Sequence, residues 1–507
     1  MRRRAARVLL ADAPSTQAMR RARPEAMEFM DASSQPTGAA DRRQDKPSPD
    51  STDMTALFAQ HARDGYDIYS RHGNEQLVRM LRMAGYDVGF CRGEGPYLFD
   101  RNGTRYLDLL SGFGVFAIGR NHPSVRAALR NVLESDLPNL IQMDAPRLAG
   151  LLADRLLQHV PHLEKALFAN SGGEAVEAAM KFARAATGRP GIVYCDHAFH
   201  GVSYGALSIN GDETFRSGFA PFLPDCVRIP FNDLAALDEA LRGGTVAAFI
   251  VEPIQGKGVN LPAAGYLKSA AEVCRRYGTL FIADEIQTGL GRTGRFLAVE
   301  HWNVEPDMVL LSKALSGGYV PVSALLTRKH VFDKVFDRMD RAMVAVSTFA
   351  ENNLAMAAGI ATLDVLAAEG LIAKAAARGD RLMQAFGEMA ERYELVREVR
   401  GKGLMIAIDF CRPQSFALRT EWDLIESARE GLFAQLITLP LFAEHKILCQ
   451  VAGPSGHAVK FLPPMTISDS DCEWIINSVE AVIAASHRVP GGAWSLGKTL
   501  VGNLVHA

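Results

Sequence analysis

Two ionisable side chains stand where apolar segments of the sequence end. Leu280–Asp284 is an apolar run that ends in a carboxylate, and Met308–Lys313 is a second run that ends in an amine. We expect both to be buried strands, and ligands of open α/β sheets bind at such strand ends. A lysine there can form a Schiff base with a carbonyl cofactor, and an aspartate can pair with a pyridinium nitrogen. Together, Lys313 and Asp284 predict a site for pyridoxal 5'-phosphate (PLP).

A glycine-rich turn supplies groups that suit a phosphate. Asn170–Glu174 lies where an expected strand gives way to a helix, and it contains Ser171, Gly172 and Gly173. Glycines let backbone N–H groups approach a ligand, and a helix N-terminus favours an anion. An ordinary strand-to-helix turn with a serine cap has the same pattern. On this segment alone, both interpretations stay open.

Further candidates follow other apolar runs. Phe199 follows one and could stack on a planar ring. His197 and His200 lie in the same loop with no Cys or acid to complete a ligand set, so we favour a structural role and predict no metal site. Glu252 ends an apolar run with an acid, and a buried carboxylate must be paired or neutral.

Two other patterns carry less information. Gly289–Gly294 matches the GxGxxG dinucleotide fingerprint, but its glycines lie beyond the strand end and no βαβ unit surrounds them, so NAD binding is not expected. Arg400 precedes a Gly-Lys-Gly segment in a β-type stretch. An arginine can donate two hydrogen bonds to one carboxylate, although a surface arginine shows the same pattern.

Strand-like and helix-like segments alternate through the middle of the chain, which predicts a mostly parallel sheet covered by helices. An Asn102-Gly103 turn predicts a hairpin between two β-rich runs. The expected strands are 165–169, 191–195, 246–252, 279–284, 308–311 and 323–327. The expected helices are 57–84, 123–135, 145–159, 174–186, 265–277 and 468–487, with further helical sequence from 351 to 390.

Composition places the chain in a broad class. It has 507 residues, 48% of them hydrophobic, and a formal net charge of −2. This balance does not point to nucleic acid or to a membrane surface, and no apolar run approaches the roughly 20 residues of a membrane helix. The seven scattered cysteines contain no CxxC pair, so we expect buried thiols and a cytoplasmic protein.

The predicted organisation has five parts. Residues 1–53 are expected to be a disordered extension. The remaining parts are the N-terminal segment of a small domain (54–135), a large PLP-binding domain (136–365), the rest of the small domain (366–490) and a tail (491–507).

The motifs occur in an order that resembles one family. From about Gly93 to the end of the final helix, the chain is similar to class-III PLP aminotransferases of fold type I, of the putrescine and ornithine aminotransferase kind. That resemblance implies an α/β fold: a large domain with a mostly parallel, seven-stranded sheet, and a smaller α+β domain. It rests on Tyr106–Gly114, Asn170–Glu177, Phe199–Gly201, Val251–Gly256, Ala283–Gly289, Ser312–Leu315, Ser347–Phe349 and Arg400–Gly403.

The resemblance also implies roles for individual residues. Lys313 would form the Schiff base and carry the proton, and Asp284 would bind the pyridine nitrogen. Gln287 would lie near the cofactor's phenolic oxygen, and Arg400 would bind the substrate α-carboxylate. The other implied cofactor-binding residues are Phe199 on the ring, Ser171, Gly172 and Gly173 on the phosphate, Thr348 from a partner subunit, and His200 and Glu252.

Two departures from the family pattern bear on the substrate. Lys257 stands where the family usually has an acid, which in ornithine-type enzymes neutralises the carboxylate-binding arginine. Gly119–Pro123 has an arginine and an asparagine before its His-Pro, where the family usually has Gly-His-x-His-Pro. A larger apolar or carrier-bound amine is therefore open as a substrate.

The predicted function is transamination from a primary amine, diamine or ω-amino acid to a 2-oxo acid such as 2-oxoglutarate or pyruvate. The expected assembly is a homodimer with shared sites, without nucleic-acid or membrane partners. Alternatives are an aminomutase or a decarboxylating enzyme of the same fold, or an ornithine or acetylornithine aminotransferase. A non-catalytic binding protein is disfavoured, because Lys313 and Asp284 are both present.

Overall fold

The computed structural model describes residues 53–62, 64–453 and 455–489, together with residues 491, 494 and 497. Residues 1–52 of the predicted disordered extension (1–53) and most of the tail predicted for 491–507 lie outside this range. Contacts divide the chain into two units, with the boundary after Ala59. Helix α1 (Met54–Gln60) spans this boundary in the sequence, and the elements from α2 onward belong to the second unit.

A seven-stranded sheet forms the centre of the second unit. β10 runs antiparallel to both of its neighbours, and the other pairings are parallel, as predicted. The edge strand β6 was not predicted, because only one of its four residues is buried. The strand order is β4 (Lys165–Ala169), β10 (Ser323–Thr327), β9 (Met308–Leu311), β8 (Leu280–Asp284), β7 (Val246–Val251), β5 (Gly191–Cys195) and β6 (Cys226–Ile229).

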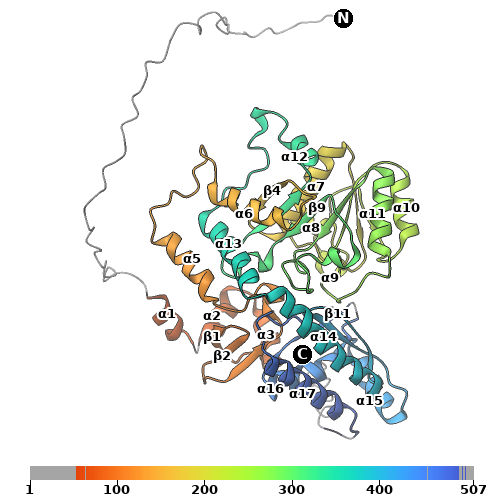
Figure 1. Ribbon diagram of the computed structural model, residues 1–507. Coiled ribbons are helices and arrows are strands. Elements are labelled where there is room, and N and C mark those ends of the chain that lie inside the picture. Colours follow the sequence, from red (N-terminus) through yellow and green to blue (C-terminus); the bar gives the residue numbers. More distant parts are fainter. Residues whose placement is uncertain are drawn as a thin grey trace, which may run out of the picture. The chain divides into compact units, whose positions relative to one another are not determined.

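The helices around this sheet begin and end at recognisable caps. In α7 (Gly172–Thr187), the Ser171 side chain caps the first turn, and Gly188 ends the helix with φ of 70°. Helices α10 and α11 pack side by side (Figure 1). The helices and 3-10 turns of this region are α8 (Tyr204–Ser208), α9 (Glu213–Arg216), α10 (Leu234–Arg242), α11 (Tyr266–Tyr277), η1 (Ala298–Trp302), η2 (Lys313–Ser316), α12 (Lys329–Val335) and η3 (Met339–Arg341).

Two four-stranded sheets complete the β structure. The predicted hairpin lies in the first, whose order is β1 (Phe90–Glu94), β2 (Tyr97–Asp100), β3 (Arg105–Asp108) and β13 (Ile447–Leu448). β13 joins β3 in parallel, so this sheet combines distant parts of the chain. The second sheet is antiparallel and has the order β11 (Val396–Lys402), β12 (Met405–Phe410), β15 (Ala458–Phe461) and β14 (Gln450–Ala452).

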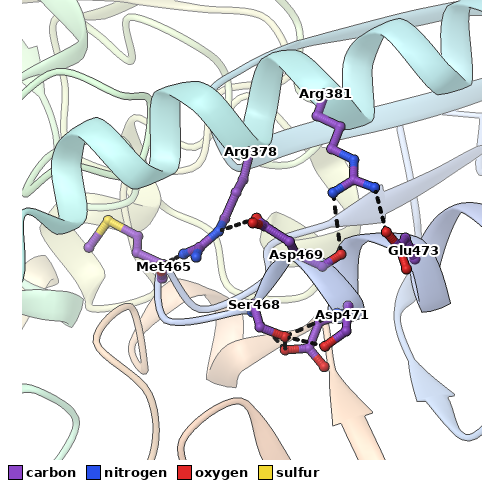
Figure 2. Close-up of polar contacts among 8 residues, drawn as sticks. Arg378, Arg381, Met465, Ser468, Asp469, Asp471 and Glu473 are labelled. Carbon is purple, nitrogen blue, oxygen red and sulfur yellow. Dashed lines mark hydrogen bonds and ion pairs between the residues drawn. The ribbon is translucent and has the colours of Figure 1, made fainter.

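Ion pairs join two long helices near this second sheet. Arg378 and Arg381 of α14 reach the N-terminal end of α17, where they contact Asp469 and Glu473 (Figure 2). Ser468 and Asp471 form a capping box that begins α17. The helices of this part are α13 (Asn353–Ala368), α14 (Leu371–Arg392), α15 (Phe416–Ala428), α16 (Leu432–Ala443) and α17 (Asp469–Ser486).

The N-terminal helical pattern is more broken than predicted. Instead of one amphipathic stretch over 57–84, helix α2 (Gly65–His72) ends at Gly73, and α3 (Glu75–Met83) begins with its own cap. The Asn74 side chain accepts a hydrogen bond from the Leu77 N–H, which favours a new helix start over continuation. The remaining helices are α4 (Ser111–Gly114), α5 (Pro123–Leu133) and α6 (Arg147–Gln158).

The structure bears on two expectations from composition, the absence of a membrane-spanning helix and the burial of the cysteines. Among the described residues, no single helix is long and apolar enough to cross a membrane, and α13 with α14 meets that requirement only as a pair bent by 61°. All seven cysteines are free thiols. The expectation that all are buried was wrong for Cys91, which is exposed, and for Cys226 and Cys411, which are half-buried.

Candidate active site

Lys313 and Asp284 lie at the same edge of the central sheet. Asp284 is the last residue of β8, and Lys313 directly follows Ser312 at the end of β9, its parallel neighbour. The lysine backbone is in the left-handed region, with φ of 41°, a strained conformation that favours a functional role. Burial lowers the pKa of Lys313, and the carboxylates of Asp284 and Glu252 offset part of this effect. The amine is therefore poised to lose its proton.

A histidine holds the Asp284 carboxylate in place. His200 Nδ1 lies 2.7 Å from Asp284 Oδ2, and both side chains are buried. The Ile286 N–H donates to the other carboxylate oxygen over 3.1 Å. Burial acts to lower the pKa of His200, but its hydrogen bond to Asp284 and the charges of Asp284 and Glu252 outweigh burial, so the pKa is raised. The pair presents a fixed carboxylate with a stabilised cationic partner.

Glu252 orders two loops from the end of β7. Its Oε1 accepts a hydrogen bond from the Phe199 N–H over 2.8 Å, and its Oε2 accepts one from the Gly256 N–H over 2.6 Å. Burial raises the pKa of this carboxyl group, and the positive charge of His200 opposes that rise. The Phe199 ring is half-buried and packs edge-on against Phe215, with ring centroids 5.1 Å apart. Glu252 thus fixes the backbone that carries the candidate stacking residue.

The glycine-rich turn lies beside the end of β8. The Ser171 hydroxyl accepts from the Glu174 N–H, and a Cβ on Gly172 would lie 3.0 Å from the Ile286 side chain. Asn170 Nδ2 donates to Ser347 Oγ over 2.9 Å. The Asn170–Glu174 turn therefore lies close to Ile286, two residues after Asp284. Ser347, the neighbour of Thr348, contacts this turn within the same chain.

A second lysine, which the sequence analysis missed, lies within the site. Lys460 comes from β15 of the second small sheet and is 2% exposed. Its Nζ donates to the Gly256 carbonyl oxygen and, over 2.8 Å, to Gln287 Oε1. Burial and the nearby charge of Lys313 lower the pKa of Lys460 to about 7. The sequence did contain a signal for this residue, a single lysine inside an otherwise apolar strand. A lysine in such a position is buried only when it has partners, so it marks a polar contact in the core.

A strained turn completes the surroundings of Gln287. All four residues of Ser111–Gly114 have positive φ, including Ser111 at 50° and Phe113 at 61°. The Ser111 hydroxyl donates to the Leu462 carbonyl oxygen over 2.6 Å, which anchors the turn. The Phe113 carbonyl oxygen accepts from Gln287 Nε2 over 3.0 Å. Backbone strain of this kind persists only where the surrounding structure fixes it.

Arg400 makes a different set of contacts. Its Nη1 donates to Glu398 and Asp409, each over 2.6 Å, and its Nε and Nη2 donate to the Gly258 carbonyl oxygen. The structure thus binds Arg400 to two acids of its own sheet and to the loop after Gly256. Its predicted contact with a substrate carboxylate stays a prediction.

Lys257, the departure from the family pattern, also has partners. It forms an ion pair with Asp212, and its Nζ lies 5.2 Å from the centre of the Phe215 ring. Burial lowers the pKa of Lys257. Because Phe215 packs against Phe199, this lysine is linked to the candidate ring-stacking residue rather than to Arg400.

These groups fit PLP. The N-terminus of α7 offers N–H donors and a hydroxyl for a phosphate, and Asp284 offers a buried carboxylate for a pyridinium nitrogen. Lys313 offers an amine of lowered pKa for an aldehyde. The Gly289–Gly294 segment forms turns rather than a helix start, in line with the expectation against NAD. No cluster that could hold a metal ion occurs among the described residues.

Replacing Gly256 by alanine should damage the site. A Cβ at this position would lie 2.6 Å from Gln287 Oε1 and 3.0 Å from Glu252 Oε2, and both oxygens already hold hydrogen bonds. Since a displacement near 1 Å can cost about 10²-fold in rate, we expect kcat/KM to fall roughly 10- to 10²-fold, with weaker PLP retention.

The matched control is Gly387→Ala in α14, where a Cβ would meet nothing within 4 Å and should stabilise the helix slightly. Steady-state kinetics and a fluorescence titration with PLP measure both effects. Equal values for Gly256→Ala and wild type would show that the packing around Gly256 does not govern the site.

The fold and site define a fold-type-I PLP enzyme, and comparison with known proteins gives the family. The sequence profile of class-III aminotransferases matches residues 84–483. The chain belongs to the class-III aminotransferase family, whose members use PLP. This membership confirms the resemblance stated from the motifs, and with it the cofactor and the enzyme class.

Several relatives are similar over most of this chain. Aminotransferase PigE of a Serratia species is 34% identical over 464 residues, which cover 85% of this chain and 54% of PigE, so the chain spans about half of that relative. Ornithine aminotransferase from Toxoplasma gondii, in a structure with partial PLP occupancy, is 31% identical with a TM-score of 0.72, covering 86% of this chain and 98% of that one. An amine transaminase from an uncultivated Pseudomonas species, solved with PLP bound, is 30% identical with a TM-score of 0.66, covering 78% and 94%.

Proposed function

We propose that this protein catalyses PLP-dependent transfer of an amino group from a primary amine, diamine or ω-amino acid to a 2-oxo acid such as 2-oxoglutarate or pyruvate. The observation that carries the proposal is the position of Lys313 and Asp284 on the ends of adjacent strands. Membership of the class-III family supports aminotransferase chemistry over an aminomutase or a decarboxylating enzyme.

Each residue of the site has a distinct task in this reaction. When bound, PLP supplies an aldehyde and an electron-accepting ring. Lys313, with its lowered pKa, provides the amine that binds the aldehyde and then carries a proton between substrate atoms. Asp284, held by His200, keeps a negative charge facing the ring nitrogen. Glu252 positions the Phe199 backbone so that its ring can cover the cofactor.

The contacts of Arg400 support a donor without a carboxylate beside its amine. Asp409 and Glu398 already neutralise the guanidinium, and the Gly258 carbonyl oxygen takes further N–H groups. A half-buried guanidinium paired in this way has few donors left for a substrate carboxylate. Primary amines and diamines need no such partner, which favours them over α-amino acids as donors. The carboxylate of the 2-oxo acid acceptor would have to compete with these contacts of Arg400 or bind elsewhere.

We also propose a homodimer in which Thr348 reaches the partner's phosphate-binding turn. Large apolar side chains are exposed near Thr348, including Met339 at 95% and Phe349 at 62%, and exposed apolar patches of this kind mark interaction surfaces. Residues from the segments 137–148 and 332–353, together with Ala166 and Leu167, line a cavity of about 600 Å³ that includes Thr348. The cytoplasmic location expected from composition stays a prediction.

A spectrum of the purified protein tests the proposed reaction. The protein with PLP should show a visible absorption band that bleaches when the amine donor is added and returns when a 2-oxo acid is added. Putrescine, ornithine and glutamate should be compared in separate cuvettes, and we expect putrescine to bleach the band most. A band that an amine bleaches without stoichiometric consumption of any 2-oxo acid would favour the aminomutase instead.

A further inference from the structure

The Lys257 side chain joins the loop after β7 to the segment that carries α9. Its ammonium group forms an ion pair with Asp212, and the two side chains are 29% and 14% exposed. The Asp212 carboxylate also caps α9, because its Oδ1 accepts a hydrogen bond from the Thr214 N–H over 2.9 Å. Solvent screens a partly buried ion pair less than a surface pair. Lys257 therefore holds the start of α9 in place.

The residue before Asp212 packs directly on the loop that carries Phe199. The Gly211 N–H donates to the Ala198 carbonyl oxygen over 2.8 Å, and the Gly211 carbonyl oxygen accepts from the His197 N–H over 3.1 Å. A Cβ at position 211 would lie 2.5 Å from the His197 nitrogen and 2.6 Å from the Ala198 nitrogen, which leaves no room for a side chain. The two backbones are therefore fixed against each other.

Two aromatic rings extend this contact from Lys257. Phe215 lies on α9, and its ring meets the Phe199 ring edge-on, with the centroids 5.1 Å apart and the planes at 70°. Lys257 Nζ lies 5.2 Å from the centroid of the Phe215 ring, within the range of a cation–π contact. Aromatic pairs favour such edge-to-face geometry, so Phe215 limits how far the Phe199 ring can tilt.

We propose that Lys257 is a positioning residue that fixes the tilt of the Phe199 ring against PLP. It acts through Asp212, which holds α9, and through Phe215, which backs the Phe199 ring. The acid that the family usually has at position 257 would repel Asp212, whereas a lysine pairs with it. This inference rests on the proposed function, because it requires PLP against Phe199.

The visible circular dichroism of bound PLP tests this role, because its strength depends on the asymmetry of the contacts around the ring. Lys257→Met keeps the length of the side chain and removes the ion pair. We expect the dichroic signal per bound PLP to fall about twofold and the Kd of PLP, from a fluorescence titration, to rise about 3- to 10-fold. Lys257→Arg, which keeps the charge, should restore most of the signal. Unchanged dichroism in Lys257→Met would overturn the proposal.

Variants of the partner residues separate positioning from a direct effect of charge. Asp212→Asn keeps an oxygen that can cap α9 but loses the ion pair, so it should lower the signal as Lys257→Met does. The double variant should lose no more than either single variant, because both break one contact. In a Phe215→Leu background, Lys257→Met should have less than about half its effect. Equal losses with and without Phe215 would show that Lys257 acts on the cofactor by charge alone.

Lys257→Glu distinguishes this role from a gate for the substrate carboxylate. The new acid would repel Asp212, so the dichroism should fall at least as far as in Lys257→Met. If position 257 instead governs the charge of Arg400, this variant should keep the wild-type dichroism and change only the choice between donors with and without a carboxylate. That result would also overturn the proposal.

The controls keep this inference apart from the proposed function. Lys268→Met, which changes an exposed lysine on α11, should leave the dichroism and the Kd unchanged. Thermal unfolding of each apoprotein checks that the variants are folded, and Lys257→Gln replaces a methionine variant that is not. If wild type forms no visible band with PLP, the proposed function fails and this inference fails with it. If wild type shows the band and the Lys257 variants match its dichroism, only the role of Lys257 fails.

Discussion

Lys313→Ala should lose the visible band of bound PLP and at least about 10³-fold of the transamination rate, since this change removes both a nucleophile and a proton carrier. No other described lysine has the position of Lys313: Lys460 Nζ is held by Gly256 and Gln287. PLP should still bind, more weakly, because the N-terminus of α7 is unchanged. Absorbance and single-turnover rates measure the two effects.

A control and a stability measurement sharpen this result. Lys268→Ala, on the exposed face of α11, should leave band and rate unchanged. Lys313→Ala should also raise the stability of the folded protein, because it removes a buried amine whose pKa burial lowers. A variant that keeps the band and the wild-type rate would refute Lys313 as the cofactor-binding amine.

Asp284→Asn should reduce the rate of transamination by roughly 10²- to 10⁴-fold. Removing one partner of a buried charged pair costs about 3–5 kcal/mol, which corresponds to that range if the pair acts in the transition state. The asparagine keeps the size of the side chain but removes the charge that faces His200 and the ring nitrogen. The measurement is kcat with saturating donor, and Asp380→Asn on the exposed face of α14 is the matched control.

The same variant makes a prediction about stability and pH. The pKa of His200 is raised in the folded protein, so the stabilisation from its pairing is complete below the unfolded pKa of about 6.5 and is lost as the pH rises through the folded value. The difference in unfolding free energy between wild type and Asp284→Asn should therefore be largest in acid and narrow toward alkaline pH. A difference that grows with pH would show that Asp284 does not raise the pKa of His200 in the folded protein.

The sequence predicts the central sheet and the Lys313–Asp284 pair because both depend on local signals. β8 and β9 are buried along nearly their whole length, so an ionisable residue marks the point where each apolar run stops. Adjacent parallel strands end at one edge, which brings the two groups together without knowledge of the loops. The weak strand β6 lacks this signal, since two of its four residues are exposed.

The contacts of Arg400 and Lys460 could not be predicted in the same way. Asp409 reaches Arg400 because the β11–β12 register pairs Arg400 with Ala407, and no local pattern specifies that register. Lys460 meets Gly256 across 204 positions of the chain. The break between α2 and α3 could have been predicted from local sequence, because asparagine at position 74 is a favourable helix cap. The prediction instead followed the apolar period, which continues across the break.

The anchor of the Ser111–Gly114 turn has a consequence for biosynthesis. The Ser111 hydroxyl donates to the Leu462 carbonyl oxygen, 351 positions later in the chain. Strand β3 likewise can pair with β13 only after β13 has been synthesised. A nascent chain on the ribosome can therefore assemble the Asn170–Glu174 turn long before the support of Gln287 exists. Contacts of such long range slow folding and leave partly built intermediates. Vitamin-derived PLP should thus be captured stably only after translation has passed β15.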